Sequence, residues 1–302
     1  MLDFIEVCRR RQIGSCVISD ETRIDYPTAS YGSFRSALES RSVEYQILER
    51  LTCDALAPLN TPSTILMCVN CVWKIQPDVI TLFNDRIFNY HNASMPDQRG
   101  AAAHSWRLMQ GACKSRMTIH EVAAGLDEGR IVVERPMEYP EACRTLKASY
   151  EYLAQFEAAF FDQFLDAPDR RVSQDETESF YWPRLNTAIH GFIDWAWTAE
   201  EIMSFCAAFD EPFAGASTFL NGRLAFLRAV DVVDRDVRFH PFQAGLIYRK
   251  ATDHICVAAK GGGLRIGNAT FSTAIKYRVG HRFVTPPEYL HLARLGKARG
   301  NG

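Results

Sequence analysis

The chain has 302 residues, of which 47% are hydrophobic and 12% aromatic, enough apolar side chains for two modest folded domains. The 34 Lys and Arg residues nearly balance the 36 Asp and Glu residues, and no run of like charge exceeds the three arginines at positions 9 to 11. This excludes a disordered or fibrous chain, and it disfavours nucleic acid as the main partner because phosphate binding normally needs a concentrated basic face.

Cysteine usage and hydropathy bear on the cellular compartment. The nine cysteines are scattered from Cys8 to Cys256 without the regular spacing of a disulfide framework, which favours a reducing environment. The segment Met1–Glu6 has no charged leader before an apolar core, and no later stretch approaches about eighteen uncharged apolar residues. We therefore expect a cytoplasmic protein that is neither secreted nor inserted in a membrane.

The first half of the chain alternates helix-like and strand-like segments, which predicts an α/β fold with a mostly parallel, Rossmann-like sheet. The uninterrupted apolar run Ile65–Trp73 is typical of a strand buried on both faces, so we place it at the sheet centre. The strand Arg86–His91 brings polar side chains to its carboxyl end, where open α/β sheets bind ligands. The other predicted elements are helices over Phe4–Arg11, Tyr45–Leu51 and Ala101–Gln110, and strands over Ile13–Ile18, Met117–Val122 and Ile131–Met137.

The second half begins with an amphipathic pattern that predicts a long helix over Leu146–Phe164, and the polar segment Asp166–Thr177 then reads as a linker. A capping-box pattern at Thr198–Glu201 predicts a helix that runs to Phe209. Short β segments separated by glycine turns follow, which predicts a small barrel. We therefore expect a catalytic domain over residues 1–170 and a small C-terminal β-barrel domain, OB-like, over residues 178–302.

The stretch Asn89–Gly100 carries three motifs in succession: Asn-x-His, Ser-x-x-Pro and Arg-Gly. A Leu-Asp-x-Gly loop follows at Leu126–Gly129, and Asp127 lies 36 residues after His91. These motifs, in this order and spacing, resemble the folate-dependent formyltransferase family, which includes methionyl-tRNA formyltransferases and sugar N-formyltransferases. The resemblance covers the chain from about residue 60 to its end.

The resemblance implies an enzyme that transfers a formyl group from 10-formyltetrahydrofolate to a primary amine, with Asn89, His91 and Asp127 as catalytic residues. An amide N–H of Asn89 can donate to the carbonyl oxygen as it gains charge, an interaction whose loss typically costs about 2–4 kcal/mol of barrier. His91 can take the amine proton or stay protonated beside that oxygen. Asp127 can orient the imidazole or hold a water that shuttles protons, and the sequence leaves these roles open.

The resemblance also implies where the two substrates bind. Ser94 and Arg99 are candidate contacts for the amine substrate, although Arg99 can equally anchor its loop through a salt bridge. Six residues are implied to contact the pterin, either around the end of the apolar strand or just before the aspartate: Val72, Trp73, Ile75, Ala123, Ala124 and Leu126.

Cys68 and Cys71 invite a metal or redox interpretation, but residues three apart on one strand face opposite sides and no nearby histidine completes a four-ligand site. We therefore predict no metal site. His104 and His120 are predicted to be structural histidines.

Members of the family usually begin with a strand ahead of the first helix, whereas this chain opens within that helix. Such a strand normally lies inside a parallel sheet, with both edges paired. We therefore expect the first strand to be missing and an exposed sheet edge near Cys16–Ile18. The result would be either a marginally stable monomer or an oligomer, such as a homodimer, that covers this edge.

Three functions compete. The first is transfer to the amine of a small molecule, such as a nucleotide-linked amino sugar or a natural-product precursor. The second is methionyl-tRNA formyltransferase activity, which the near-neutral charge disfavours. The third is a catalytically inactive relative that acts as a binding module, which the presence of Asn89, His91 and Asp127 disfavours.

Overall fold

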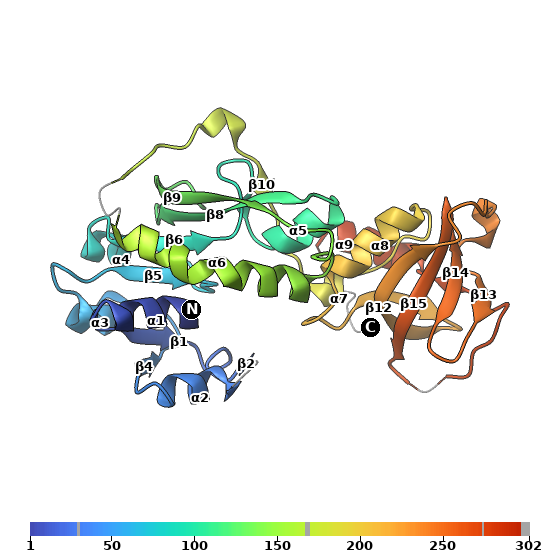
Figure 1. The fold of residues 1–302 in the computed structure, drawn as a ribbon, viewed down its shortest axis with the longest axis horizontal. Helices are drawn as coiled ribbons and strands as arrows, with labels where there is room; N and C mark the ends of the chain where they lie inside the picture. Colours follow the sequence, from blue (N-terminus) through green and yellow to red (C-terminus); the bar gives the residue numbers. More distant parts are fainter. Residues whose placement is uncertain (29–30, 167–169, 274, 297–302) are drawn as a thin grey trace. The chain divides into compact units, whose positions relative to one another are not determined.

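The computed structural model describes residues 1–28, 31–166, 170–273 and 275–296 (Figure 1). The chain divides into two compact units that alternate along the sequence. The first unit consists of residues 1–99, 116–136 and 153–180, and the second of residues 100–115, 137–152 and 181–302. The domain boundary that we place between residues 170 and 178 stays a prediction.

The first unit opens with helix α1 (Leu2–Arg10), close to the predicted bounds, and strand β1 (Cys16–Ser19) follows. β1 pairs in parallel with β4 (Glu44–Ile47), with Val17 opposite Tyr45. The helix predicted over Tyr45–Leu51 is therefore wrong. Tyr45 and Ile47 pack on the apolar cluster around Val17, and this pairing outweighs the local helical spacing.

Short elements surround the β1–β4 sheet. Helix α2 (Phe34–Glu39) begins at Ser33, whose side chain accepts a hydrogen bond from the Ser36 amide. The other short elements of this region are β2 (Pro27–Thr28), β3 (Gly32–Ser33), α3 (Cys53–Leu56) and the 3₁₀ helix η1 (Ala57–Leu59).

A second sheet in the first unit has the strand order β5, β6, β8, β9. β5 and β6 run parallel, whereas β6 and β8 run antiparallel, so the sheet is mixed. The apolar run Ile65–Trp73 forms a strand only over its first part, because Asn70 adopts a left-handed backbone that ends the strand. This strand lies at the edge of the sheet rather than at its centre, where the apolar pattern predicts it. The bounds are β5 (Leu66–Val69), β6 (Ile87–His91), β8 (Lys114–Glu121) and β9 (Ile131–Glu138).

Helix α6 (Leu146–Asp166) runs along one face of this sheet (Figure 1). The Phe164 ring lies 5.0 Å from that of Phe88, and the Phe161 ring 4.9 Å from that of Tyr90, between centroids. Phe161, outside the expected apolar stripe, is fully buried, whereas Tyr150 within that stripe is exposed. Helix α4 (Pro77–Phe83) connects β5 to β6.

The second unit contains α5 (Ala103–Met109) and α8 (Ala199–Ala208), and the predicted capping box at Thr198 and Glu201 is present. Its sheet has the order β13, β14, β15, β12, β11, β16, with antiparallel pairing. A bridge between Leu246 and Arg282 connects the two ends, so the sheet curls as predicted for a small barrel. The strand bounds are β11 (Ala216–Leu220), β12 (Arg223–Val233), β13 (Ile247–Lys250), β14 (Ile255–Ala259), β15 (Gly262–Phe271) and β16 (Phe283–Val284).

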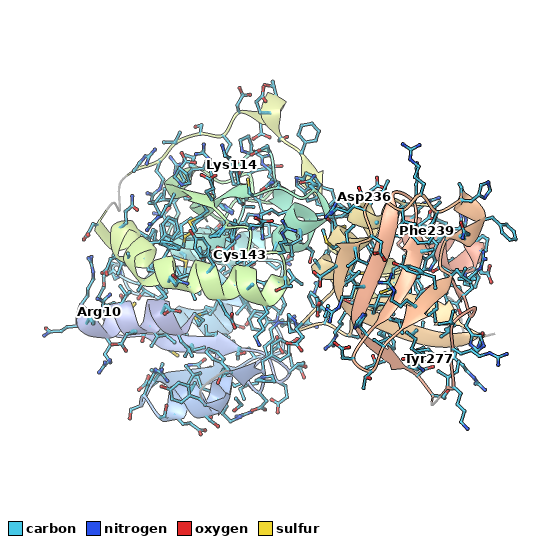
Figure 2. All side chains as sticks on the ribbon, turned by 45° about the vertical axis from the view of Figure 1, so that its right-hand side comes forward. Arg10, Lys114, Cys143, Asp236, Phe239 and Tyr277 are labelled. Carbon is cyan, nitrogen blue, oxygen red and sulfur yellow. The ribbon has the colours of Figure 1, made fainter. Side chains whose placement is uncertain are left out.

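Loops around this sheet carry aromatic side chains. The Phe239 ring lies 4.8 Å from that of Tyr248, and the Tyr277 ring 5.4 Å from that of Phe271; Figure 2 labels Phe239 and Tyr277. The remaining elements of the unit are α7 (Thr187–His190), the 3₁₀ helix η3 (Pro241–Gln243) and α9 (Pro287–Arg294).

The segment predicted as a linker packs on the first unit where it is described. Residues 167–169 of that segment lie outside the described residues. Val172 forms a bridge with Ile131 at the start of β9, and the 3₁₀ helix η2 spans Glu176–Glu178. Two short strands, β7 (Arg99–Gly100) and β10 (Tyr181–Trp182), pair with each other. Within the described part of the chain, no helix is long and apolar enough to cross a membrane.

Candidate active site

Asn89 lies on β6 directly opposite His120 on the antiparallel strand β8. The Asn89 side-chain nitrogen Nδ2 is 3.2 Å from Nε2 of His120 and 3.5 Å from Oδ1 of Asp127. His120 Nδ1 is 2.7 Å from the backbone carbonyl of Glu121, which can only accept, so Nδ1 carries the ring proton and Nε2 a lone pair. The two hydrogens of the Asn89 amide therefore point at two acceptors, the imidazole and the carboxylate.

His91, the last residue of β6, shares its strand face with Asn89 because side chains two apart lie on the same side. Its Nε2 lies 3.2 Å from the backbone carbonyl of Gln98, which again can only accept. The proton of a neutral His91 therefore sits on Nε2, and Nδ1 keeps a lone pair. The His91 and His120 rings lie 6.2 Å apart between centroids, so His91 is beside the Asn89 group and not hydrogen-bonded within it.

Asp127 lies in the loop between β8 and β9 with a left-handed backbone, φ 56°, a region that Asp adopts more readily than most residues. Gly129 makes this turn possible. A β-carbon at position 129 would lie 1.7 Å from the carbonyl oxygen of Glu121, so only glycine fits there without moving the backbone. The loop thus brings the Asp127 carboxylate back to the strands, where its side chain is 10% exposed.

A brace from residues 174–176 holds this loop. Gln174 Nε2 donates to the backbone carbonyls of Asp127, at 2.8 Å, and Gly129, at 2.6 Å. Arg99 donates to the side-chain oxygen of Gln174 and makes a two-bond ion pair with Glu176, at 2.7 and 2.8 Å. The buried guanidinium of Arg99 is thus engaged inside the protein, as expected for a loop anchor.

Glu121, next to His120, is a second anchor. Its buried carboxylate accepts from Arg130 at 2.6 and 3.0 Å and also from Arg171. The Arg171 guanidinium lies 5.2 Å from the centre of the Phe88 ring. Residues 171–176 therefore secure both ends of the β8–β9 loop.

Burial sets the protonation state of His120. Desolvation lowers its pKa below the ordinary value of 6.5, although the Asp127 carboxylate acts in the opposite direction. Nearby His91 and Arg99 also lower it. His120 is therefore neutral near pH 7, which fits its role as an acceptor for the Asn89 amide.

This depressed pKa predicts a pH effect on stability. The unfolded chain binds a proton at His120 that the folded protein excludes, so stability is lost as the pH falls below about 6.5. Replacing His120 with glutamine removes that proton. Between about pH 7.5 and pH 5, Tm measured by circular dichroism should fall less in His120→Gln than in the wild type, while His291→Ala, on the exposed surface of α9, keeps the wild-type slope. Equal slopes in all three proteins would contradict a buried neutral His120.

The residues proposed to contact the pterin occupy two loops. Val72, Trp73 and Ile75 lie between β5 and α4, and the Trp73 indole donates to the Glu49 carbonyl at 2.9 Å. Ala123, Ala124 and Leu126 lie in the β8–β9 loop, where Leu126 is 57% exposed. Trp73, Ile75 and Val122 pack on one apolar cluster around Cys68.

The other sequence candidates are placed as follows. Ser94 lies in a turn in which its backbone N–H donates to Gln98 Oε1. Cys71 lies beyond the end of β5, and a hydrogen bond with Cys68 lowers the pKa of its thiol to about 7, so these thiols lie together rather than on opposite faces. Among the described residues, no group of three or more potential metal ligands gathers. The His104 ring meets the Tyr139 ring edge-on in the second unit, 6.1 Å apart between centroids.

The formyl transferase family matches residues 49–164, and the formyl transferase C-terminal domain matches residues 187–279. A methionyl-tRNA formyltransferase from Thiobacillus denitrificans is 31% identical over 224 residues, which are 73% of this chain and 71% of that protein. The chain belongs to the formyl transferase family. This confirms the resemblance drawn from the Asn-x-His and Leu-Asp-x-Gly motifs.

Two solved structures share the fold of this formyl transferase. The N-formyltransferase from Helicobacter canadensis, in complex with folinic acid and dTDP-3-aminofucose, has a TM-score of 0.60 at 15% identity and covers 89% of this chain and 95% of its own. HypX from Aquifex aeolicus, in complex with tetrahydrofolic acid, has a TM-score of 0.54 at 15% identity. That match covers 94% of this chain but 48% of HypX. The predicted fold class, an α/β sheet domain with a curled C-terminal β domain, is confirmed.

Sequence reasoning missed two residues of the site in this formyl transferase. His120 was predicted to be structural, yet it contacts both Asn89 and Asp127. The signal that points to His120 is its position two residues from Thr118 on a strand that pairs with β6, so that these two side chains share one strand face. No local motif marks Gln174 in the sequence, and its contact with the Asp127 loop is seen only in the folded structure.

Proposed function

We propose that this protein transfers a formyl group from 10-formyltetrahydrofolate to the primary amine of a small molecule, such as a nucleotide-linked amino sugar or a natural-product precursor. The observation that carries formyl transfer is the contact of Asn89 with His120 and Asp127, with His91 on the same strand face, in a chain of the formyl transferase family. These four side chains supply a hydrogen-bond donor, a base and an orienting charge at one place.

The apolar side chains of the two loops fit the chemistry of the formyl donor. A flat pterin needs apolar contacts on its faces, and Leu126 offers an apolar side chain that is 57% exposed beside Asp127. Val72, Trp73 and Ile75 would hold the other side. The bound donor would supply the formyl carbon. Two relatives of the same fold were solved with folinic acid and with tetrahydrofolic acid.

Asn89 stabilises charge in this proposal. Its contact with Asp127, at 3.5 Å, is at the long limit of a hydrogen bond, so that N–H is the one that a substrate oxygen can take. The shorter contact with His120 fixes the plane of the amide meanwhile. Such a pre-positioned donor stabilises an oxygen that gains negative charge.

His91 acts as the base. Its Nε2–H is held by the Gln98 carbonyl, so the lone pair on Nδ1 can accept the proton that the attacking amine loses as its nitrogen bonds to the formyl carbon. The bond from the formyl carbon to the folate nitrogen would break in the same transfer, and the proton would pass to that nitrogen so that tetrahydrofolate leaves. Asp127 lies on the other side of Asn89, within 3.5 Å of His120. Its carboxylate orients Asn89 and favours positive charge that develops on the amine or on His91.

A small acceptor is supported by charge pairing in the second unit, where some of the cationic side chains already face acidic partners. Five of its arginines lie in ion pairs with aspartate or glutamate: Arg228, Arg235, Arg249, Arg265 and Arg294. Paired cations contribute little to binding a polyanion, because the protein's own carboxylates compete with phosphate.

A charged tRNA is the alternative acceptor, and two observations favour it. The 31% identical relative is named methionyl-tRNA formyltransferase. Residues 181–302 also carry fifteen Lys and Arg against ten Asp and Glu, so the near-neutral total conceals an excess of five positive charges in this part. Such an excess is the usual electrostatic basis for binding nucleic acid.

An acceptor screen tests the proposal. The protein is incubated with 10-formyltetrahydrofolate and either amino sugar nucleotides, free amino sugars or charged initiator methionyl-tRNA, and products are analysed by mass spectrometry. A formylated amine of small size is the expected result. Formylation of the tRNA alone would establish the alternative, and absence of any product with intact donor would refute formyl transfer.

The salt dependence of the Michaelis constant gives a second prediction. With a small acceptor, KM should change only modestly between about 50 and 200 mM salt, because few phosphates are bound. An acceptor that makes six to ten phosphate contacts would lose about 10³–10⁵ in affinity over that range. Steady-state kinetics at four salt concentrations measure the slope, and a steep slope excludes the small acceptor.

A further inference from the structure

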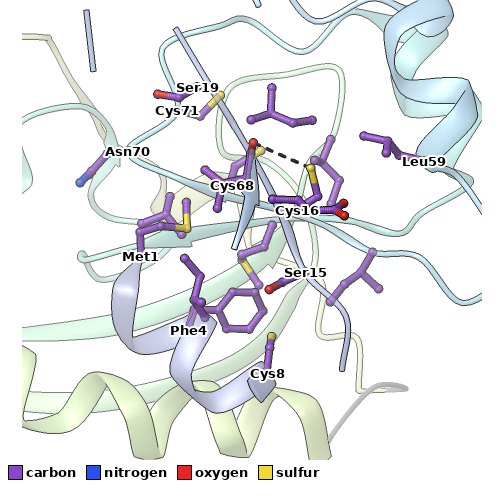
Figure 3. Close-up of a pocket in the computed structure, with 18 of the residues that line it drawn as sticks. Met1, Phe4, Cys8, Ser15, Cys16, Ser19, Leu59, Cys68, Asn70 and Cys71 are labelled. Carbon is purple, nitrogen blue, oxygen red and sulfur yellow. Dashed lines mark hydrogen bonds between the residues drawn. The ribbon is translucent and has the colours of Figure 1, made fainter. Parts of the chain in front are cut away.

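Two thiols meet where strand β5 ends, at the sequence Cys68-Val69-Asn70-Cys71, whose first, third and fourth residues are labelled in Figure 3. Along a regular strand, residues three apart are separated by about 10 Å, which is beyond the reach of a disulfide. Asn70 adopts a left-handed backbone, φ 51°, that turns the chain after Val69. The turn brings the Cys71 sulfur within reach of the Cys68 thiol, which donates a hydrogen bond to it.

The two cysteines differ in exposure and in protonation. Cys68 is buried within β5, whereas Cys71 is exposed. The hydrogen bond from Cys68 lowers the pKa of the Cys71 thiol to about 7, and the nearby Arg23 guanidinium acts in the same direction. The same hydrogen bond, together with burial, raises the pKa of Cys68. Cys71 is thus the nucleophilic thiolate of the pair, and Cys68 is a neutral thiol beside it.

Two further cysteines show what sets this pair apart. Cys16 on β1 borders the same pocket as Cys68 and Cys71 (Figure 3), but burial raises the pKa of its thiol. It is therefore a poor nucleophile at neutral pH. Cys113, in the second unit, is exposed as Cys71 is. Cys71 combines such exposure with a neighbouring thiol that stabilises its thiolate.

The cysteine pair lies beside residues of the candidate active site. Cys71 hydrogen-bonds the backbone of Trp73 in both protonation states: the thiol donates to the carbonyl at 3.5 Å, and the thiolate accepts from the amide. Cys68 stands directly opposite Asn89 in the register of β5 and β6. A chemical change at the pair therefore acts on the loop that is proposed to hold the donor.

We propose that Cys71 and Cys68 form an oxidation site for hydroperoxides, and that the resulting disulfide weakens binding of the folate donor. The Cys71 thiolate attacks the O–O bond of hydrogen peroxide, so that an S–O bond forms, the O–O bond breaks and hydroxide leaves. The Cys68 sulfur then attacks the sulfenic acid on Cys71. An S–S bond forms, the S–O bond breaks, and the departing hydroxide takes the Cys68 proton and leaves as water. The sulfur pair loses two electrons, which reduce the peroxide.

The effect on the donor rests on the proposed function. A disulfide carries neither an S–H nor a negative charge, so Cys71 loses its hydrogen bonds with the Trp73 backbone. Loss of one hydrogen bond typically weakens an interaction by about two- to tenfold. The loop that carries Val72 and Trp73 is then held less firmly, and the affinity for the donor should fall by that factor.

Peptide mapping of the whole protein tests the oxidation site. The reduced protein is treated with hydrogen peroxide, the remaining thiols are blocked with N-ethylmaleimide, and tryptic peptides are analysed by mass spectrometry. The peptide 51–74 should lose two thiol hydrogens, and its fragment ions should place the bridge between Cys68 and Cys71, with Cys53 alkylated. Cys71 should be oxidised at least about tenfold faster than Cys113. In Cys68→Ser, Cys71 should keep a sulfenic acid that dimedone labels.

Three results would overturn the oxidation site: no bridge in the wild type, a bridge from Cys68 to Cys16, or equal oxidation rates at Cys71 and Cys113. Cys68 is buried, so Cys68→Ser can fail to fold. Cys71→Ser, at an exposed position, then decides. Peroxide should leave its peptide 51–74 without a bridge, and a bridge in that variant would overturn the pairing of Cys68 with Cys71.

Calorimetry with folinic acid tests the effect on the donor. The oxidised protein should bind about two- to tenfold more weakly than the reduced protein, and dithiothreitol should restore the affinity. Peroxide should weaken binding equally in the control Cys113→Ser and leave binding by Cys71→Ser unchanged. Equal affinities of the oxidised and reduced wild type would overturn this effect. Failure of both forms to bind folinic acid would instead contradict the proposed function, whereas the mapped disulfide would still establish the oxidation site.

Discussion

Substituting His91 with alanine is expected to lower kcat/KM for formyl transfer by about 10²–10⁴-fold, the usual contribution of a positioned general base. The loss should appear in kcat, because His91 accepts a proton only as the amine reacts. His91 is a half-buried residue at the end of a strand, so Tm should change little. Steady-state kinetics with saturating donor, together with thermal melts, measure both effects.

His291→Ala, on the exposed surface of α9, is the matched control and should keep wild-type activity. Near-wild-type turnover in His91→Ala would show that His91 takes no part in the chemistry. If His120→Ala were then inactive while folded, the base would be reassigned to His120, whose Nε2 lone pair already faces Asn89.

Asp127→Asn should be about as damaging, with kcat/KM lower by about 10²–10⁴-fold. The substitution keeps the size of the side chain and removes the charge that faces Asn89 and His120. Position 127 adopts a left-handed backbone, which asparagine tolerates as well as aspartate, so the loop should persist. Activity assays and binding of folinic acid by calorimetry separate the two effects, because binding should survive when turnover is lost.

The control for this charge change is Asp236→Asn, at an exposed loop position of the second unit (Figure 2). Its activity should equal that of the wild type. Loss of folinic acid binding in Asp127→Asn would instead indicate that the loop has collapsed. An active Asp127→Asn variant would show that the carboxylate charge has no part in catalysis.

Local patterns predicted the parts of the site that depend on neighbours in the sequence. The two-residue spacing of Asn89 and His91 on one strand sufficed to place them on one face, and the structure has them there. The Leu-Asp-x-Gly motif pointed to a turn, and Gly129 proves necessary for it. Both inferences rest on interactions that span a few residues.

Interactions between distant segments decided what local patterns did not predict. The segment Tyr45–Leu51 has helical spacing, yet Tyr45 and Ile47 pair with β1 about thirty residues earlier. The apolar run that begins at Ile65 stops forming a strand at Asn70. Its composition is typical of a central strand, although the strand lies at the edge of its sheet. Gln174 braces Asp127 from 47 residues away in the chain, and no local rule detects such a contact.

The brace at residues 171–176 also determines when the site can form during synthesis. A nascent chain that has emerged through α6 already contains Asn89, His91, His120 and Asp127. It lacks Gln174, which holds the Asp127 loop, and Arg171, which holds Glu121 beside His120. Because chains emerge from the ribosome from the amino end and fold progressively, the β8–β9 loop stays unsecured until this segment has followed. Maturation of the site is therefore a late step in the folding of a unit whose strands are made early.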